Sequence, residues 1–150
     1  MKQLNGHEKR SIKAVLDTNV LVSAFVFRKR LGIIEQLVKR GDITPCFTER
    51  TFEELKIVFS YPKLEYAFKK INVSQEELIE VIVEKSIIIS TPSYIPQIIK
   101  SDFPDNHILA CALHSGASFI ISGDLRILEL KHFHNIPIIT PRQFLGIFNQ

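Results

Sequence analysis

The sequence has few of the residues that mark secreted or membrane proteins. It holds two cysteines in 150 residues, Cys46 and Cys111, which lie far apart and outside any CxxC motif. Small secreted domains carry a denser, even set of cysteines, so this pattern favours a reducing cytoplasm and predicts two small core residues. No apolar run approaches the roughly 18 residues of a membrane span, and the polar start of the chain lacks the apolar segment of a signal peptide. Export and membrane insertion are therefore not expected.

An excess of charge of one sign is also lacking. The 19 Lys and Arg residues oppose 16 Asp and Glu residues, which leaves a net charge of +3 at pH 7. This balance permits a nucleic-acid partner but does not require one. A chain of this length buries about 68–70% of the surface that its unfolded form exposes, so one core can hold it without disulfides. Residues 1–11 are almost without apolar side chains and are predicted to form a flexible N-terminal arm, whereas residues 12–150 form a single domain.

Five short apolar runs are predicted to be the strands of a central sheet. They are residues 12–16, 43–47, 87–89, 119–121 and 136–139. Residues with helical spacing follow each run, and this alternation is typical of an α/β fold with a mainly parallel sheet. Capping signals mark the helix starts, as where Ser74 precedes Glu77 by three residues. The stretch 91–104 holds three prolines and is predicted to be a connecting loop.

The positions of the aspartates carry the functional signal. Asp17 and Asp124 each follow a predicted strand, and Asp105 begins the helix after the long loop. Ligands of open α/β sheets bind in the crevice at the carboxyl ends of the strands, so these three acids are expected to share one crevice. Glu54, in the helix after the second strand, can reach the same place. Asp102 stays open between an acid that supports this site and a simple loop residue.

Carboxylates that share a crevice repel one another, and each is costly to bury alone. A divalent cation resolves this conflict, and ligation by oxygen alone suits Mg²⁺ or Mn²⁺, whereas zinc recruits His or Cys. His107 and His114 are seven residues apart, which is not the i, i+4 spacing of helical zinc sites. Because such an ion acidifies water and neutralises charge on a phosphate, the pattern predicts metal-dependent phosphoryl or phosphodiester chemistry.

Four segments, in order, resemble the acidic motifs of PIN-domain nucleases. They are VLDTNVL at 15–21, EL at 54–55, DNHILA at 105–110 and ISGD at 121–124, within a match that spans residues 12–142. The resemblance implies a Rossmann-like three-layer sandwich with a mainly parallel central sheet of about five strands. It also implies a Mg²⁺- or Mn²⁺-dependent endoribonuclease. Many prokaryotic members, the VapC-like proteins, are toxins restrained by an antitoxin protein, and a homodimer is expected on the same ground.

The resemblance also assigns residues by their place in the motifs. The catalytic and metal-binding acids would be Asp17, Glu54, Asp105 and Asp124. Asp17 and Asp105 would hold the principal metal with Asp124 close by, and Glu54 would complete the shell or orient water. Three neighbouring polar residues are expected to support these acids: Thr18, Asn19 and Ser122.

Several alternatives stay open from the sequence. Arg28, Lys29 and Arg30 either contact RNA phosphates, in which case binding weakens with salt, or form a solvated turn. A metal-dependent phosphatase also fits acids on a parallel sheet, but its pattern has a second acid two positions after the first, where this chain has Asn19. A phospho-receiver domain has a lysine at the end of the last strand, where this chain has Thr140. The third alternative is a catalytically silent RNA- or partner-binding module, which the intact set of acids disfavours.

Overall fold

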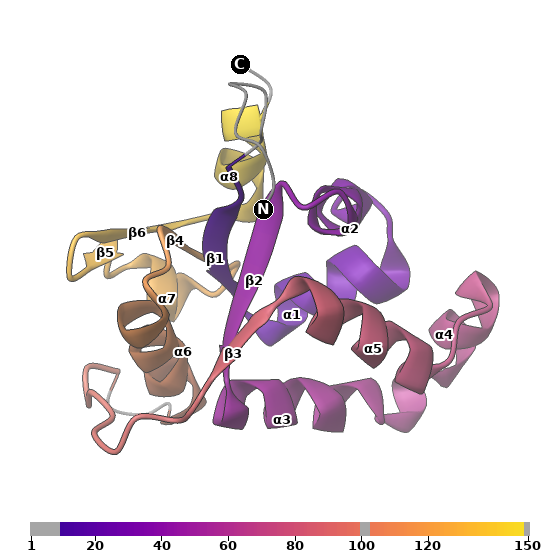
Figure 1. Ribbon diagram of the computed structural model, residues 1–150, viewed down its shortest axis with the longest axis horizontal. Coiled ribbons are helices and arrows are strands. Elements are labelled where there is room, and N and C mark those ends of the chain that lie inside the picture. Colours follow the sequence, from indigo (N-terminus) through magenta and orange to yellow (C-terminus); the bar gives the residue numbers. More distant parts are fainter. Residues whose placement is uncertain (1–9, 100–102, 149–150) are drawn as a thin grey trace, which may run out of the picture.

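The structure is a computed structural model that describes residues 10–99 and 103–148 (Figure 1). Asp102 and most of the predicted N-terminal arm lie outside these ranges. The strands are β1 (Ile12–Leu16), β2 (Ile43–Thr48), β3 (Ile87–Ile89), β4 (Phe119–Ile121), β5 (His132–Phe133) and β6 (Ile136–Ile139). They form one sheet in the order β3-β2-β1-β4-β6-β5, with every neighbouring pair parallel except β5 and β6. The five predicted strands and the mainly parallel sheet are therefore confirmed.

Strand β5 is the one strand that the sequence did not predict. It pairs antiparallel with β6, so that Phe133 lies opposite Ile136. His134 and Asn135 form the two-residue turn between them, and both have positive φ, at 48° and 64°. Two positive φ angles are the mark of a type I′ hairpin turn. A strand of two residues has no detectable alternation, and this turn lacks the glycine that usually signals such a hairpin, so no local pattern predicts a strand here.

Helices follow the strands, as the spacing of apolar residues predicted. They are α1 (Thr18–Val22), the π-helical turn η1 (Ser23–Phe27), α2 (Gly32–Lys39), α3 (Glu49–Phe59), the 3-10 turn η2 (Pro62–Leu64), α4 (Glu65–Ile71), α5 (Gln75–Lys85), α6 (Phe103–Ser115), α7 (Leu125–Leu128) and α8 (Pro141–Phe148). Ser74 and Glu77 form the predicted capping box of α5. In the part of the chain described, none of these helices is long and apolar enough to cross a membrane.

The predicted loop over residues 91–104 is shorter than expected. Its described part, up to Ile99, has no helix or strand, but α6 already begins at Phe103. Pro104 therefore lies inside the first helical turn. A proline is tolerated there because the first N–H groups of a helix have no partner within the helix.

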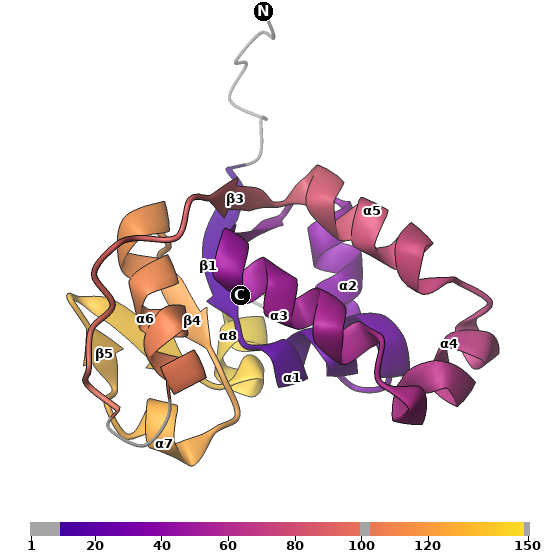
Figure 2. The same ribbon diagram turned by 90° about the horizontal axis from the view of Figure 1, so that it is seen from below.

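The sheet is covered on both faces, which confirms the three-layer prediction. Ala14 and Leu16 of β1 belong to a core cluster shared with α1, η1, α2, α3, α4, α5 and α8. Val15, between them, points to the other face and joins the cluster formed with α6 and α7. Figure 2 shows α6 and α7 on one side of the sheet and α1, α2 and α5 on the other. This alternation follows from the period of two residues along a strand.

The order of the strands fixes where a ligand can bind. From β1 the chain builds β2 and β3 on one side and then crosses back to place β4 on the other side of β1. The carboxyl ends of β1 and β4 are therefore the topological switch point, where open α/β sheets bind their ligands. Leu16 pairs with Ile121, and the amide of Asp17 donates to the carbonyl of Ile121 at 3.0 Å. The loops that begin at Asp17 and Ser122 thus start side by side.

The packing of α8 gives a test of the domain boundary. Phe144 is fully buried, and its ring centroid lies 5.6 Å from that of Phe119 and 5.4 Å from that of Phe148. Phe144→Ala should lower the free energy of unfolding by about 3–5 kcal/mol in urea denaturation, because it removes a buried ring and leaves a cavity. Tyr66→Ala, at a side chain that is 73% exposed, is the control. Equal stability of both variants would show that α8 does not belong to the core.

The cysteines are core residues, as predicted. Cys46 and Cys111 are both free thiols with exposed fractions of 2% and 0%. Burial raises the pKa of Cys46, and burial together with the neighbouring Cys46 raises the pKa of Cys111 to about 12. Because the thiolate is the reactive form, neither cysteine should react with a thiol reagent at pH 8 in the native protein, whereas both should react in guanidinium. Rapid labelling of the native protein, measured by absorbance and mass, would contradict this burial.

Candidate functional site

A cleft of about 600 Å³ opens at the switch point of the sheet. Four elements each bring one predicted acid to it, and the polar residues Thr18 and Asn19 lie beside them. The acids that line the cleft are Asp17 after β1, Glu54 in α3, Asp105 in α6 and Asp124 before α7. The structure thus gathers in one cleft four carboxylates that are spread over most of the sequence. Their roles as catalytic residues and metal ligands remain predictions.

Asp17 is the most constrained of these acids. It caps α1: its Oδ1 accepts a hydrogen bond from the amide of Val20 at 2.8 Å, and its Oδ2 accepts one from the hydroxyl of Ser122. Burial raises the pKa of the Asp17 carboxyl, and the negative charge of Asp124 raises it further, while the hydrogen bonds from Ser122, Val20 and Gly123 oppose this rise. The net effect is a raised pKa, so the protein holds this carboxylate in an environment that disfavours its charge.

Ser122 connects the first and last acids of the site. Its side chain is fully buried, and besides donating to Asp17 its Oγ accepts a hydrogen bond from the amide of Asp124 at 3.0 Å. One hydroxyl therefore joins the loop after β1 to the loop after β4. Ser122 thereby contacts the carboxylate of Asp17 and the backbone of Asp124.

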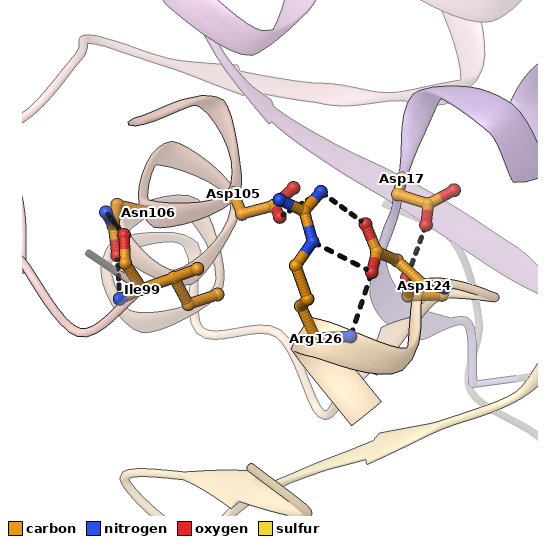
Figure 3. A network of polar contacts seen from close by, with 7 residues as sticks. Asp17, Ile99, Asp105, Asn106, Asp124 and Arg126 are labelled. Carbon is orange, nitrogen blue, oxygen red and sulfur yellow. Dashed lines mark hydrogen bonds and ion pairs between the residues drawn. The ribbon is translucent and has the colours of Figure 1, made fainter. Parts of the chain in front are cut away.

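Asn106 positions Asp105, although the sequence analysis gave it no role. Its side chain is 1% exposed, its Oδ1 accepts from the amides of Ile98 at 3.1 Å and Ile99 at 2.9 Å, and its Nδ2 donates to the carbonyl of Ile99 at 2.8 Å. The amide thereby ties the end of the long loop to the first turn of α6, where Asp105 lies (Figure 3). The signal in the sequence is an amide directly after the acid at a helix start, but no local pattern shows that its partners lie seven and eight residues upstream.

Arg126 is the second residue that the sequence analysis missed. Its Nη2 lies 3.0 Å from Oδ2 of Asp124 and 3.5 Å from Oδ2 of Asp105. Figure 3 shows the guanidinium between these two carboxylates, with Asp17 on the far side of Asp124. The hydrogen bonds from Arg126 lower the pKa of the Asp124 carboxyl. Asp17 and Asp124 are therefore shifted in opposite directions, because one is buried and the other is paired with a cation.

The basic triplet before α2 does not line the cleft. Nε of Arg28 donates to the carbonyl of Phe25 at 2.9 Å, and its Nη2 lies 3.7 Å from a carboxylate oxygen of Glu35. These contacts close the end of η1, where Arg28 has a positive φ of 54°. Lys29 and Arg30 are exposed. Contact with RNA stays a prediction for this triplet, whereas Lys63 does line the cleft.

The donors in the cleft suit Mg²⁺ or Mn²⁺ better than zinc. Among the described residues that line it there is no His or Cys, and the charged donors are carboxylate oxygens. His107 is buried, and burial together with the charge of Arg50 lowers its pKa. Within residues 10–99 and 103–148, no three His, Cys, Asp or Glu side chains converge tightly enough to form a metal-binding group. The residues thus have the right chemistry, and a cation, Arg126, already lies between two of them.

The chain is similar in sequence to a known protein family, in agreement with this geometry. The profile of the PIN domain matches residues 13–126. The chain belongs to the PIN domain family. This membership confirms the resemblance of the acidic motifs, and the matched residues include all four acids. A search of curated proteins gives no match.

Solved structures share the fold of this PIN domain. The structure of VapBC2 from Rickettsia felis, bound to a DNA fragment from its promoter, has a TM-score of 0.57 and 17% identity, and the match covers 86% of this chain and 98% of the other. FitAB bound to the IR36 DNA fragment has a TM-score of 0.51 and 14% identity, with 85% and 94% covered. FitAcB from Neisseria gonorrhoeae has a TM-score of 0.50 and 13% identity, with 86% and 98% covered. At these identities the likeness shows the fold.

The environment of Asp17 predicts pKa changes of opposite sign in two variants. Ser122→Ala should raise the pKa of the Asp17 carboxyl, because it removes a hydrogen bond to the ionised form. Asp124→Asn should lower that pKa, because it removes a neighbouring negative charge. The measurement is a pH titration of the Asp17 carboxyl carbon by NMR without metal, with Ser93→Ala in an exposed loop as the control. Shifts of the same sign in both variants would refute this description of the site.

Proposed function

We propose that this PIN domain is a metal-dependent endoribonuclease that hydrolyses RNA phosphodiester bonds. The observation that carries the proposal is the gathering of Asp17, Glu54, Asp105 and Asp124 in one cleft at the switch point of the sheet. Membership of the PIN domain family supports a nuclease in general. The choice of RNA as the substrate rests on the resemblance of the four acidic motifs.

Mg²⁺ or Mn²⁺ is the cofactor that we propose for this site. Asp17 and Asp105 would hold the principal ion, with Asp124 and Glu54 completing its surroundings. When bound, such an ion supplies Lewis-acid chemistry: it neutralises charge on a phosphate and makes water more acidic. A bound cation would also favour the ionised form of Asp17, whose pKa burial raises.

The residues of the chain prepare the cleft for this chemistry. Asp17 is fixed by the amide of Val20 and the hydroxyl of Ser122, and each of its oxygens keeps capacity for a further ligand. Asn106 holds the start of α6 against the long loop, which places Asp105. Lys63 lines the same cleft as the acids and can attract the phosphate backbone of RNA toward it.

An antitoxin protein is the partner that we propose, with the chain acting as the toxin of a VapC-like pair. The fold likeness to chains of VapBC2 and FitAB supports this role. We also propose a homodimer and a cytoplasmic location, the latter because both cysteines are buried free thiols.

A catalytically silent RNA- or partner-binding module is the alternative, and the observation that favours it is the cation Arg126 held against Asp105 and Asp124.

Cleavage of labelled single-stranded RNA and DNA with Mn²⁺, Mg²⁺ or EDTA tests the proposed function. We expect metal-dependent cleavage of RNA, and a loss of about 100-fold or more in Asp17→Asn and in Asp124→Asn, because each change removes a charge that the metal site needs. Asp42→Asn is the matched control: Asp42 pairs with Arg40 at the amino end of β2, the opposite edge of the sheet from the cleft.

The pattern of losses separates the alternatives. Cleavage that disappears with EDTA and in both cleft variants, but not in Asp42→Asn, supports the metal-dependent nuclease. RNA binding without cleavage under any metal, unchanged in Asp17→Asn, supports the silent module. Cleavage of DNA alone would contradict the assignment of RNA as the substrate.

A further inference from the structure

Arg126 lies on the carboxylates that the proposed metal would use. Its Nη2 contacts Oδ2 of Asp124 at 3.0 Å and Oδ2 of Asp105 at 3.5 Å, and its Nε lies 3.4 Å from Oδ1 of Asp124. Its backbone amide also donates to Oδ1 of Asp124 at 2.9 Å. One residue therefore contacts two acids that come from different elements, α6 and the loop before α7 (Figure 3).

This arrangement differs from an ordinary surface ion pair. The side chain of Asp105 is 12% exposed and that of Asp124 is 32% exposed, so the two carboxylates are partly withdrawn from water. Carboxylates that are withdrawn from water and close to one another need a compensating positive charge. The guanidinium supplies that charge, and it keeps it because an arginine side chain does not lose its proton in proteins.

A divalent ion and the guanidinium cannot both occupy the space between these two acids. Both are cations, and an ion on the same oxygens would repel the guanidinium at short distance. The side chain of Arg126 is 52% exposed, so it has a path into solvent. In the described residues the acids do not converge into a metal-binding group while Arg126 lies between two of them.

We propose that Arg126 is an internal counter-ion that competes with the divalent metal for Asp105 and Asp124, and that metal binding displaces it. Arg126 then sets the metal affinity of the site: it neutralises the acids when no ion is bound and weakens the binding of any ion that arrives. It acts through its contacts with the two acids and is not itself a metal ligand. This inference rests on the proposed function, since it takes Asp105 and Asp124 as metal ligands.

Direct Mn²⁺ binding to the full chain without RNA tests this role. Calorimetry, together with the electron paramagnetic resonance signal of free Mn²⁺, gives the dissociation constant for each variant. Arg126→Gln should bind Mn²⁺ about three- to tenfold more tightly than the original chain, because no cation has to leave the acids. Arg126→Lys, which keeps the charge, should return the dissociation constant most of the way to the original value.

Arg40→Gln is the matched control for the loss of an arginine. Arg40 makes the same kind of pair, with Asp42 two residues later, through Nη2 at 3.0 Å and Nε at 3.2 Å, but at the opposite edge of the sheet. Its Mn²⁺ dissociation constant should equal that of the original chain. Circular dichroism of each variant establishes that it is folded, and Asp105→Asn serves as the variant that lacks the metal site.

Each outcome decides between the inference and the proposed function. Equal Mn²⁺ binding by the original chain and Arg126→Gln, lost in Asp105→Asn, overturns the role of Arg126 and leaves the metal site intact. Weaker binding by Arg126→Gln also overturns it, because Arg126 would then support the geometry of the site. If neither the original chain nor any variant binds Mn²⁺, both the inference and the metal-dependent function fail.

Discussion

The need to balance negative charge in a partly buried cleft is the constraint on which the rest of this structure depends. Parallel pairing of β1 with β4 sets Asp17 and Asp124 at neighbouring strand ends, and α3 and α6 bring Glu54 and Asp105 to the same cleft. Such a group of carboxylates is unfavourable unless hydrogen bonds and positive charge compensate it. The protein uses both, through the hydroxyl of Ser122, the amide of Val20 in α1, and the guanidinium of Arg126.

The two ends of the site are compensated in different ways, and this difference has chemical meaning. Asp17 is buried and receives hydrogen bonds from neutral groups, so its pKa lies above the ordinary value. Asp124 is more exposed and pairs with Arg126, so its pKa lies below it. A cation that enters the cleft gains most at Asp17, whose hydrogen-bond partners among the described residues are neutral, and meets a competitor at Asp124. A bound cation would therefore stabilise the charge of Asp17, whereas Arg126 already neutralises the charge of Asp124.

Much of the fold was predictable because it depends on local patterns. Continuous apolar runs such as residues 12–16 mark strands buried on both faces, and the capping box at Ser74 marks the start of α5. The short strand β5 escaped prediction because two residues show no period and its turn, His134 and Asn135, carries no glycine. Helix α6 begins two residues before the predicted start at Asp105, because Pro104, which usually indicates a loop, is tolerated in a first helical turn.

The sequence by itself determined the alternating α/β order, the buried cysteines, and the three aspartates that follow strands or begin a helix, because each depends on residues close together in the chain. Only the tertiary structure decided that Asn106 bonds to Ile99 and that Arg126 lies between Asp105 and Asp124. Those contacts depend on the packing of α6 beside α7 on one face of the sheet. Residues that are far apart in the sequence make this packing, and no local pattern shows which of them meet. A local pattern therefore predicts the acids but not the cation that neutralises them.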